Sequence, residues 1–546
     1  MGHDKTVDVE LILVALVAAV VLGTLLGRRY RVGPPVLLIA IGALLGLIPM
    51  FGEAKINGEW VLLLFLPAIL YWESLNTSLR EMRANQRVII FLSVALVIAT
   101  AFAVAWIGRE LGMDPRAAAV LGAVLSPTDA AAVAGLAKKL PRRSLVVLSG
   151  ESLINDGTAL VLFALTVQVA VGGGVAGPLQ MAGRFVGSYV GGIVAGLVVG
   201  GAVTMLRRRI DAPLEEGALS LWTPFAAFLL AEAVGGSGVV AVLVAGLTLA
   251  YYGPRVIRAR SRLQTYSFWE VTTFIINGSL WVFVGVQVPG AMRHIDRAHD
   301  GLGHAFVLAF AVTGVIIVSR IFWVEASTLL LRVLDRRQAH IERRTSWRQR
   351  LITSWSGFRG AVSLAAALAV PMTTQSGAPF PDRNMIIFVV TVVILVTVLV
   401  QGSTLPLIVR WAQLPADDEY LSELQLAREH SAATALAALP GIAERCHISP
   451  RIQARLIEEY EGRAAVIADQ EGGPGRTTYK AKRVREVRLK VLFEQRTALA
   501  QLRKQGLIDD IVLREVQAEL DLEEVQLLNY AADDDEDTPW TTETEC

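Results

Sequence analysis

Long apolar stretches, separated by short polar segments, fill the first three-quarters of the chain. About 20 apolar residues in a helix cross the roughly 30 Å hydrocarbon core of a bilayer. We therefore predict an all-α polytopic membrane protein. Its thirteen predicted spans cover residues 9–27, 35–51, 59–75, 87–107, 117–137, 145–170, 180–206, 219–235, 237–253, 267–289, 302–331, 350–371 and 384–410.

Basic residues alternate between the segments that connect these spans. The segments after the odd-numbered spans, up to the eleventh, contain Arg28, Arg29 and Arg31; Arg80, Arg83 and Arg87; Lys138, Lys139, Arg142 and Arg143; Arg207, Arg208 and Arg209; Arg255, Arg258, Arg260 and Arg262; and a run from Arg332 to Arg350. The intervening segments have two basic residues or fewer. Because cytoplasmic loops are enriched in Lys and Arg, we predict a plasma-membrane protein with its N-terminus outside and its C-terminus in the cytoplasm.

The pattern changes abruptly near Leu414. Residues 415–546 are polar with helical periodicity, and Ser449-Pro450 has the cap and first-turn residues of a helix start. An acidic run over 533–537 is close to the end. We predict a transmembrane domain over residues 1–413 and a helical cytoplasmic domain over 414–546, with a role in regulation or dimer contacts.

Composition excludes several functional classes. Charged residues are 18% of the chain and hydrophobic residues 53%, too few charges for a soluble enzyme of this length. The net charge of +1 does not favour nucleic acid as a partner. The two cysteines, Cys446 and Cys546, form neither a disulfide framework nor a metal-binding set. We expect no cofactor.

The charges that remain inside the predicted spans are the candidate functional residues, because an ionisable side chain at the bilayer centre costs about 2.5–3.5 kcal/mol. With neighbouring polar residues they are Glu73; Ser126, Thr128 and Asp129; Glu151, Ser152, Asn155, Asp156 and Thr158; Arg320; and Arg359. Ser152 and Asp156 are four residues apart and share one helix face. Oxygen ligands alone suit a hard cation. Glu151 with Arg320 also fits a buried ion pair between the sixth and eleventh spans.

Two of the spans are interrupted in their middle. Pro127 lacks an amide hydrogen and clashes with the carbonyl four residues back, so we predict unwound backbone in the fifth span. Ser356-Gly357-Phe358-Arg359-Gly360 interrupts the twelfth span, which crosses in the opposite direction. Inverted pairs of broken helices mark the binding sites of secondary transporters. Asp129 and Arg359 would compensate the charges of the helix ends, or serve only as structural charge balance.

Six motifs in order along residues 10–411 resemble the monovalent cation:proton antiporters, specifically the sodium/proton exchanger branch. The most specific are SPTDAAAV, followed by GESLINDGTALVLF; the others include FLPAILYWES and SWSGFRGAVSLAAALAVP. The resemblance implies thirteen spans in two inverted repeats, two crossing unwound helices and a homodimer. It also implies that Asp156, after Asn155, binds either Na⁺ or H⁺, and that exchange is electroneutral. Ser152, the Thr128 carbonyl and Glu73 would complete the cation's oxygen shell, while Glu151 with Arg320 and Asp129 with Arg359 would be structural or field-setting.

The function that follows is exchange of Na⁺ for H⁺. Burial favours the protonated carboxyl and a bound cation favours the ionised one. Asp156 would therefore cross either protonated or paired with Na⁺, which couples the two fluxes. Li⁺ or K⁺ could use the same oxygens, so a K⁺/H⁺ antiporter is an alternative. A cation channel fits poorly because it needs a continuous pore with several sites, and an intramembrane enzyme lacks a Ser/His or paired-Asp arrangement at depth.

Overall fold

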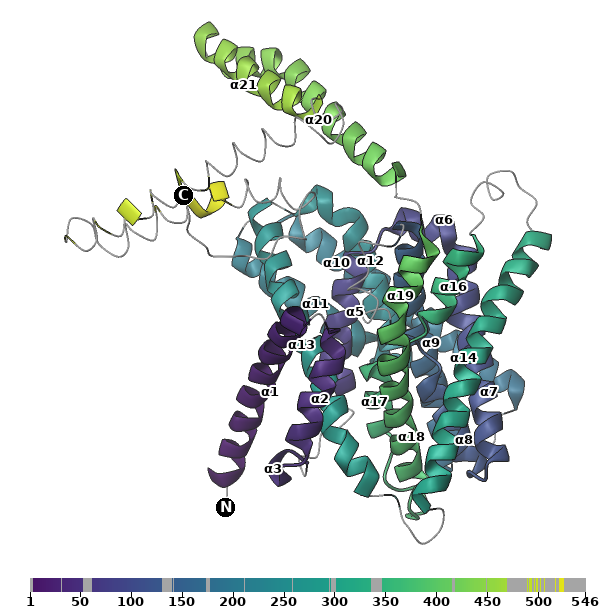
Figure 1. Cartoon of the computed structure of the whole chain (residues 1–546). Helices are drawn as coiled ribbons and strands as arrows, with labels where there is room; N and C mark the ends of the chain where they lie inside the picture. The colour runs from purple at the N-terminus through teal and green to yellow at the C-terminus, as the bar shows by residue number, and fades with distance from the viewer. Residues whose placement is uncertain are drawn as a thin grey trace. The chain divides into compact units, whose positions relative to one another are not determined.

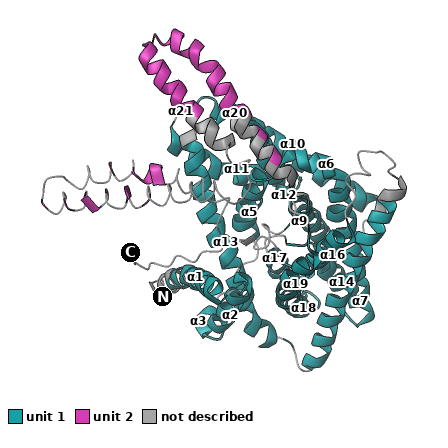
Figure 2. Ribbon diagram, turned by 45° about the horizontal axis from the view of Figure 1, so that its top comes forward, with its two compact units in different colours: residues 1–416 teal, residues 417–546 magenta. Residues whose placement is uncertain are grey.

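The structure is a computed structural model of the chain. It describes residues 3–30, 32–52, 61–129, 140, 142–172, 177–210, 212–257, 259–293, 295, 301–334, 346–414, 418–447 and 449–468, with scattered positions from 489 to 524. Contacts divide the chain into two compact units, Met1–Ala416 and Asp417–Cys546 (Figure 2). Across the described residues the only β-pairing is an isolated bridge between Thr373 and Pro379.

The first unit is a bundle of helices that run side by side (Figure 1). Its N-terminal half contains α1 (His3–Tyr30), α2 (Pro34–Gly46), α3 (Pro49–Gly52), the π-helical η1 (Val61–Phe65), α5 (Leu66–Leu75), α6 (Leu79–Ile90), the π-helical η2 (Phe91–Ala95), α7 (Leu96–Glu110), α8 (Pro115–Leu125) and α9 (Arg142–Val171). Its second half contains α10 (Pro178–Arg207), α11 (Pro213–Ala233), α12 (Gly238–Val256), α13 (Ala259–Arg293), α14 (Gly301–Leu334), α16 (Trp347–Trp355), α17 (Ala361–Leu368), α18 (Arg383–Val396), the π-helical η4 (Thr397–Gln401) and α19 (Gly402–Ala412).

Helices occupy part or all of every stretch predicted to span the membrane. Within the described residues, seven helical stretches are long and apolar enough to cross a bilayer, and four shorter apolar helices accompany them. The structure differs from the predicted spans in detail. The stretch 35–51 contains two helices, α2 and α3. Several basic residues that were predicted to lie in connecting segments lie on helices, among them Arg80, Arg83 and Arg87 on α6 and Arg142 and Arg143 on α9. The predicted fifth span is described only as far as Asp129.

The two larger clusters of buried apolar side chains pack most helices of the first unit together. One joins α7, α8, α13, α14, α17 and α18 around residues such as Leu121, Val282 and Val389. The other joins α5, α10, α11, α12 and α13 around Tyr71 and Trp269. Because α5 and α13 contribute side chains to both clusters, they lie where the two meet.

The second unit is described mainly by α20 (Asp418–Arg445) and α21 (Pro450–Ala468), which pack against each other. The helix α21 begins at Pro450, as predicted, and the Ser449 carbonyl accepts the amide hydrogens of Ile452 and Gln453 at 3.0 and 3.1 Å. The acidic run over 533–537 lies outside the described residues.

Glycines allow α2 and α13 to approach at backbone contact. A Cβ atom added to Gly285 would collide with the Ile39 carbonyl oxygen and lie 2.7 Å from the backbone nitrogen of Ala43. In lipid, where helices gain little from the hydrophobic effect, such close packing of small residues drives helix association. The contact between α2 and α13 therefore depends on the missing side chain of Gly285.

We expect Gly285→Ala to destabilise the protein by about 1–3 kcal/mol, because overpacking forces the two backbones apart. The matched control is Gly290→Ala on the same helix, where an added Cβ meets nothing within 4 Å. Thermal unfolding of detergent-purified protein measures both. Equal midpoints for the two variants would contradict the packing role of Gly285.

Candidate cation-binding site

Two non-helical segments meet inside the first unit. The first covers Ser126–Asp129 after the end of α8, and the second covers Ser356–Gly360 between α16 and α17. The amide of Asp129 donates to the carbonyl of Phe358 at 3.0 Å, so the two segments are joined directly through their backbones. Both were predicted to be unwound, and the structure has both as irregular backbone.

Charged side chains lie at the helix ends that these segments create. Arg359 is buried, and its Nε donates at 2.8 Å to the carbonyl of Leu125, which is the last residue of α8. On the other side, Asp129 lies against the start of α17: a Cβ added to Gly360 would collide with the Asp129 carboxylate. A cation at a helix C-terminus and an anion at an N-terminus both offset the helix dipole. This is the geometry expected if the two residues compensate the broken ends.

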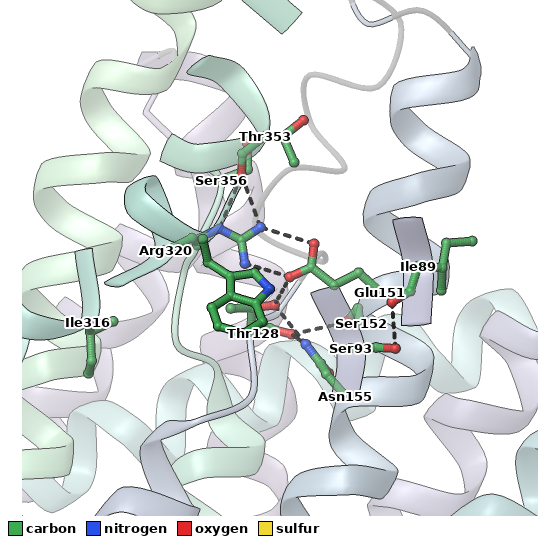
Figure 3. Close-up of polar contacts among 12 residues, drawn as sticks. Ile89, Ser93, Thr128, Glu151, Ser152, Asn155, Ile316, Arg320, Thr353 and Ser356 are labelled. Carbon is green, nitrogen blue, oxygen red and sulfur yellow. Dashed lines mark hydrogen bonds and ion pairs between the residues drawn. The ribbon is translucent and has the colours of Figure 1, made fainter. Parts of the chain in front are cut away.

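A buried ion pair anchors the first segment (Figure 3). Arg320 on α14 donates through both terminal nitrogens to the Glu151 carboxylate on α9, at 3.1 Å for Nη2 to Oε2. Its Nε and Nη2 also donate to the carbonyl of Thr353, in the last turn of α16, at 3.1 and 3.0 Å. The Thr128 hydroxyl in turn donates to Glu151 Oε1 at 3.0 Å. Arg320 and Glu151 therefore tie α9, α14 and α16 to the unwound segment at Thr128.

The backbone carbonyl of Thr128 is held by two side chains of α9. It accepts from the Ser152 hydroxyl at 3.2 Å and from Asn155 Nδ2 at 3.1 Å. Asn155 Nδ2 also donates to the Thr128 hydroxyl at 2.7 Å (Figure 3). The interaction fixes the position of this carbonyl next to the helix turn that carries Asp156.

Asp156 borders a small cavity beside the crossing. The cavity has a volume of about 30 Å³, enough for a water-sized particle. Its lining residues are Leu66, Ile69, Glu73, Pro127, Thr128, Asp129, Ser152, Asp156, Asn277, Leu280, Trp281, Gly360, Ala361, Val362 and Ser363. Three of these side chains are carboxylic acids, and among the described lining residues there is no Lys, Arg or His. The cavity is therefore acidic, and its composition favours a cation.

A cation here would need mixed oxygen ligands. Among the described residues, no group of three or more His, Cys, Asp or Glu side chains is arranged to hold a metal ion. Hydroxyl and carbonyl oxygens would have to complete the shell of a carboxylate-bound cation. Such neutral oxygen ligands suit hard cations.

The structure brings together four of the five residues predicted for cation or proton binding: Glu73, Thr128, Ser152 and Asp156 all line the cavity. Asn155 is outside that lining and contacts Thr128 instead. Sequence reasoning missed Asn277 and Trp281 on α13 and Ser363 on α17. A lone serine in the run AVSLAAAL is the signal that could have identified Ser363.

Comparison with known proteins gives consistent results. Residues 13–411 match the family described as "Sodium/hydrogen exchanger, transmembrane". The chain is 65% identical over 534 residues to the uncharacterized Na⁺/H⁺ exchanger Rv2287 of Mycobacterium tuberculosis, covering 97% of this chain and 98% of that protein. It is 30% identical over 527 residues to the uncharacterized Na⁺/H⁺ exchanger YjcE of Escherichia coli, covering 91% and 95%.

The fold is also similar to a solved structure. The sodium proton antiporter MjNhaP1 of Methanocaldococcus jannaschii aligns with a TM-score of 0.57 and 19% identity. The alignment covers 74% of this chain and 99% of that one. At this identity the likeness concerns the fold alone. The chain is an all-helical, multi-pass membrane protein that belongs to the sodium/hydrogen exchanger family, a family of antiport transporters and not of enzymes.

Proposed function

We propose that this protein exchanges Na⁺ for H⁺ and that the two ions compete for the Asp156 carboxylate. The observation that supports this most strongly is the acidic cavity, in which Asp156, Glu73 and Asp129 meet without a basic side chain among the described lining residues. Asp156 is 9% exposed, so a bare charge there is poorly solvated. Either a proton or a cation has to neutralise it.

The ligands we propose for Na⁺ are Asp156, the Ser152 hydroxyl, the Thr128 carbonyl and Glu73. The hydrogen bond from Ser152 to Thr128 uses a lone pair of that carbonyl, and Asn155 uses the other. When Na⁺ binds, the Ser152 hydrogen would turn away, which leaves both the hydroxyl oxygen and the carbonyl facing the ion. Asn155 would keep the carbonyl in position without binding the ion itself.

Glu151, Arg320, Asp129 and Arg359 have supporting roles in this proposal. Glu151 with Arg320 fixes Thr128 through its hydroxyl, and Asp129 with Arg359 offsets the charges of the two helix ends at the crossing. In the proposed cycle Asp156 crosses neutral, either protonated or paired with Na⁺. One exchanged cation per proton moves no net charge, so exchange is electroneutral.

The proposed topology has thirteen spans in two inverted repeats, with the N-terminus outside and the C-terminus in the cytoplasm of the cell. Alternating access is a rigid-body movement of the helices around the crossing against a dimer-forming part. Residues 414–546 form a cytoplasmic regulatory domain in this proposal, and the working unit is a homodimer.

The test of ion identity is a pH-gradient assay in proteoliposomes with Na⁺, Li⁺ and K⁺ compared at several pH values. We expect Na⁺ to dissipate the gradient, with a half-saturating concentration that rises as the pH falls because protons compete for the same carboxylate. An imposed membrane potential should leave the rate unchanged. A response to K⁺ alone would replace the Na⁺ assignment with K⁺/H⁺ exchange, and a Na⁺ current without coupled proton flux would instead indicate a channel.

A further inference from the structure

Ser363 on α17 has a buried hydroxyl without a hydrogen-bond partner. The residue is 1% exposed, and its Oγ has no partner within the described part of the chain. A buried serine inside a helix can donate to the carbonyl four residues earlier. Ser93 on η2 does so to Ile89 at 2.7 Å, and Ser74 on α5 does so to Leu70 at 2.5 Å.

The reason that Ser363 lacks this bond is the break before α17. Four residues earlier is Arg359, which lies in the non-helical segment, so its carbonyl is outside the helical ladder. Leaving a buried hydroxyl unsatisfied is costly, and such groups in native proteins call for an explanation. The same residue lines the acidic cavity with Asp156 and Ser152.

We infer that the Ser363 hydroxyl oxygen is a further ligand of the transported cation. This rests on the proposed function, in which the cation binds in the cavity that Asp156 borders. A hydroxyl that is free of the helix ladder can turn its hydrogen away and present an oxygen lone pair to a hard cation. The ion would then have ligands on α17 as well as on α9 and α5.

The charge distribution around α17 is compatible with this assignment. The N-terminal end of a helix is by itself unfavourable for a cation. Here the Asp129 carboxylate lies against Gly360, at the start of the same helix, and it also lines the cavity. Its negative charge offsets the positive end of α17 at the place where Ser363 faces the ion.

The inference is tested by Na⁺-dependent proton flux in proteoliposomes at fixed pH. We expect Ser363→Ala to raise the half-saturating Na⁺ concentration about tenfold, the size of effect that loss of one polar interaction gives. Ser363→Thr retains the hydroxyl and should stay near the wild-type value. The matched control is Ser93→Ala, because Ser93 is a buried serine on η2 that is absent from the described cavity lining.

An unchanged half-saturating concentration in Ser363→Ala, or an equal loss in Ser363→Ala and Ser363→Thr, would overturn the inference. If the alanine variant does not fold, Ser363→Cys gives the same reading, because sulfur is a poor ligand for Na⁺. Asp156→Asn is measured in parallel. If Asp156→Asn loses exchange while Ser363→Ala keeps the normal Na⁺ dependence, only the assignment of Ser363 is wrong. If Asp156→Asn still exchanges, the proposed function is wrong.

Discussion

Glu151→Gln is expected to destabilise the protein by about 3–5 kcal/mol, the cost of leaving one partner of a buried ion pair uncompensated. Glu151 and Arg320 have side chains only 1% and 2% exposed, and Arg320 also holds the Thr353 carbonyl. With the carboxylate gone, the guanidinium charge stays buried without its counterion. Glutamine keeps one side-chain oxygen, so the Thr128 hydroxyl and Arg320 then share a single acceptor in place of two. Unfolding of detergent-purified protein measures the loss.

The matched control is Glu325→Gln. Glu325 pairs with Arg350 at 3.0 Å, but its side chain is 46% exposed, so solvent screens the pair. We expect a change below about 1 kcal/mol there. If both glutamine variants unfold alike, burial is not what makes the Glu151–Arg320 pair important.

Asp156→Asn is expected to reduce Na⁺-dependent proton flux to the level of empty liposomes. The amide is close in shape to the carboxylate and carries no charge, so it can neither release a proton nor neutralise a cation. A neutral polar group is also cheaper to bury than a charge, so folding should be retained. Flux is followed with a pH-sensitive dye inside the liposomes.

Asp114→Asn is the control for that variant. Asp114 caps the start of α8 by accepting the Arg116 amide at 2.8 Å, and asparagine caps helices equally well. Its exchange rate should equal that of the wild type. A similar loss of flux in both variants would indicate a general effect of removing an acid rather than a role of Asp156.

The sequence alone predicted the places where the helices break. Pro127 cannot continue a helical ladder, and the glycines around Arg359 favour an irregular segment, so both interruptions follow from local chemistry. The partnership of Glu151 and Arg320 was also predictable, because a charge in lipid needs a counterion. What the sequence could not predict is which backbone groups meet, such as the bond from Asp129 to Phe358, since it depends on packing between distant segments.

Ser363 and Asn155 show that side-chain contacts were also beyond prediction from the sequence. The hydroxyl of Ser363 has no hydrogen-bond partner among the described residues, because Arg359, four positions earlier, lies outside the helix. This depends on the backbone conformation of the break. Asn155 was grouped with the binding residues by its position before Asp156, whereas its amide contacts Thr128. Positions on a helix face indicate which residues are neighbours, but not which of them reaches the cavity.

If Na⁺ and H⁺ share the Asp156 carboxylate, the protein releases protons when Na⁺ binds. Purified protein in weak buffer is mixed with NaCl while Na⁺ binding and pH are recorded. We expect the wild type to release about one proton for each Na⁺ bound when the carboxyl starts protonated, because binding requires the ionised ligand. We expect Asp156→Asn to release none. Na⁺ binding without proton release in the wild type, or the same release from Asp156→Asn, would contradict a shared site at Asp156.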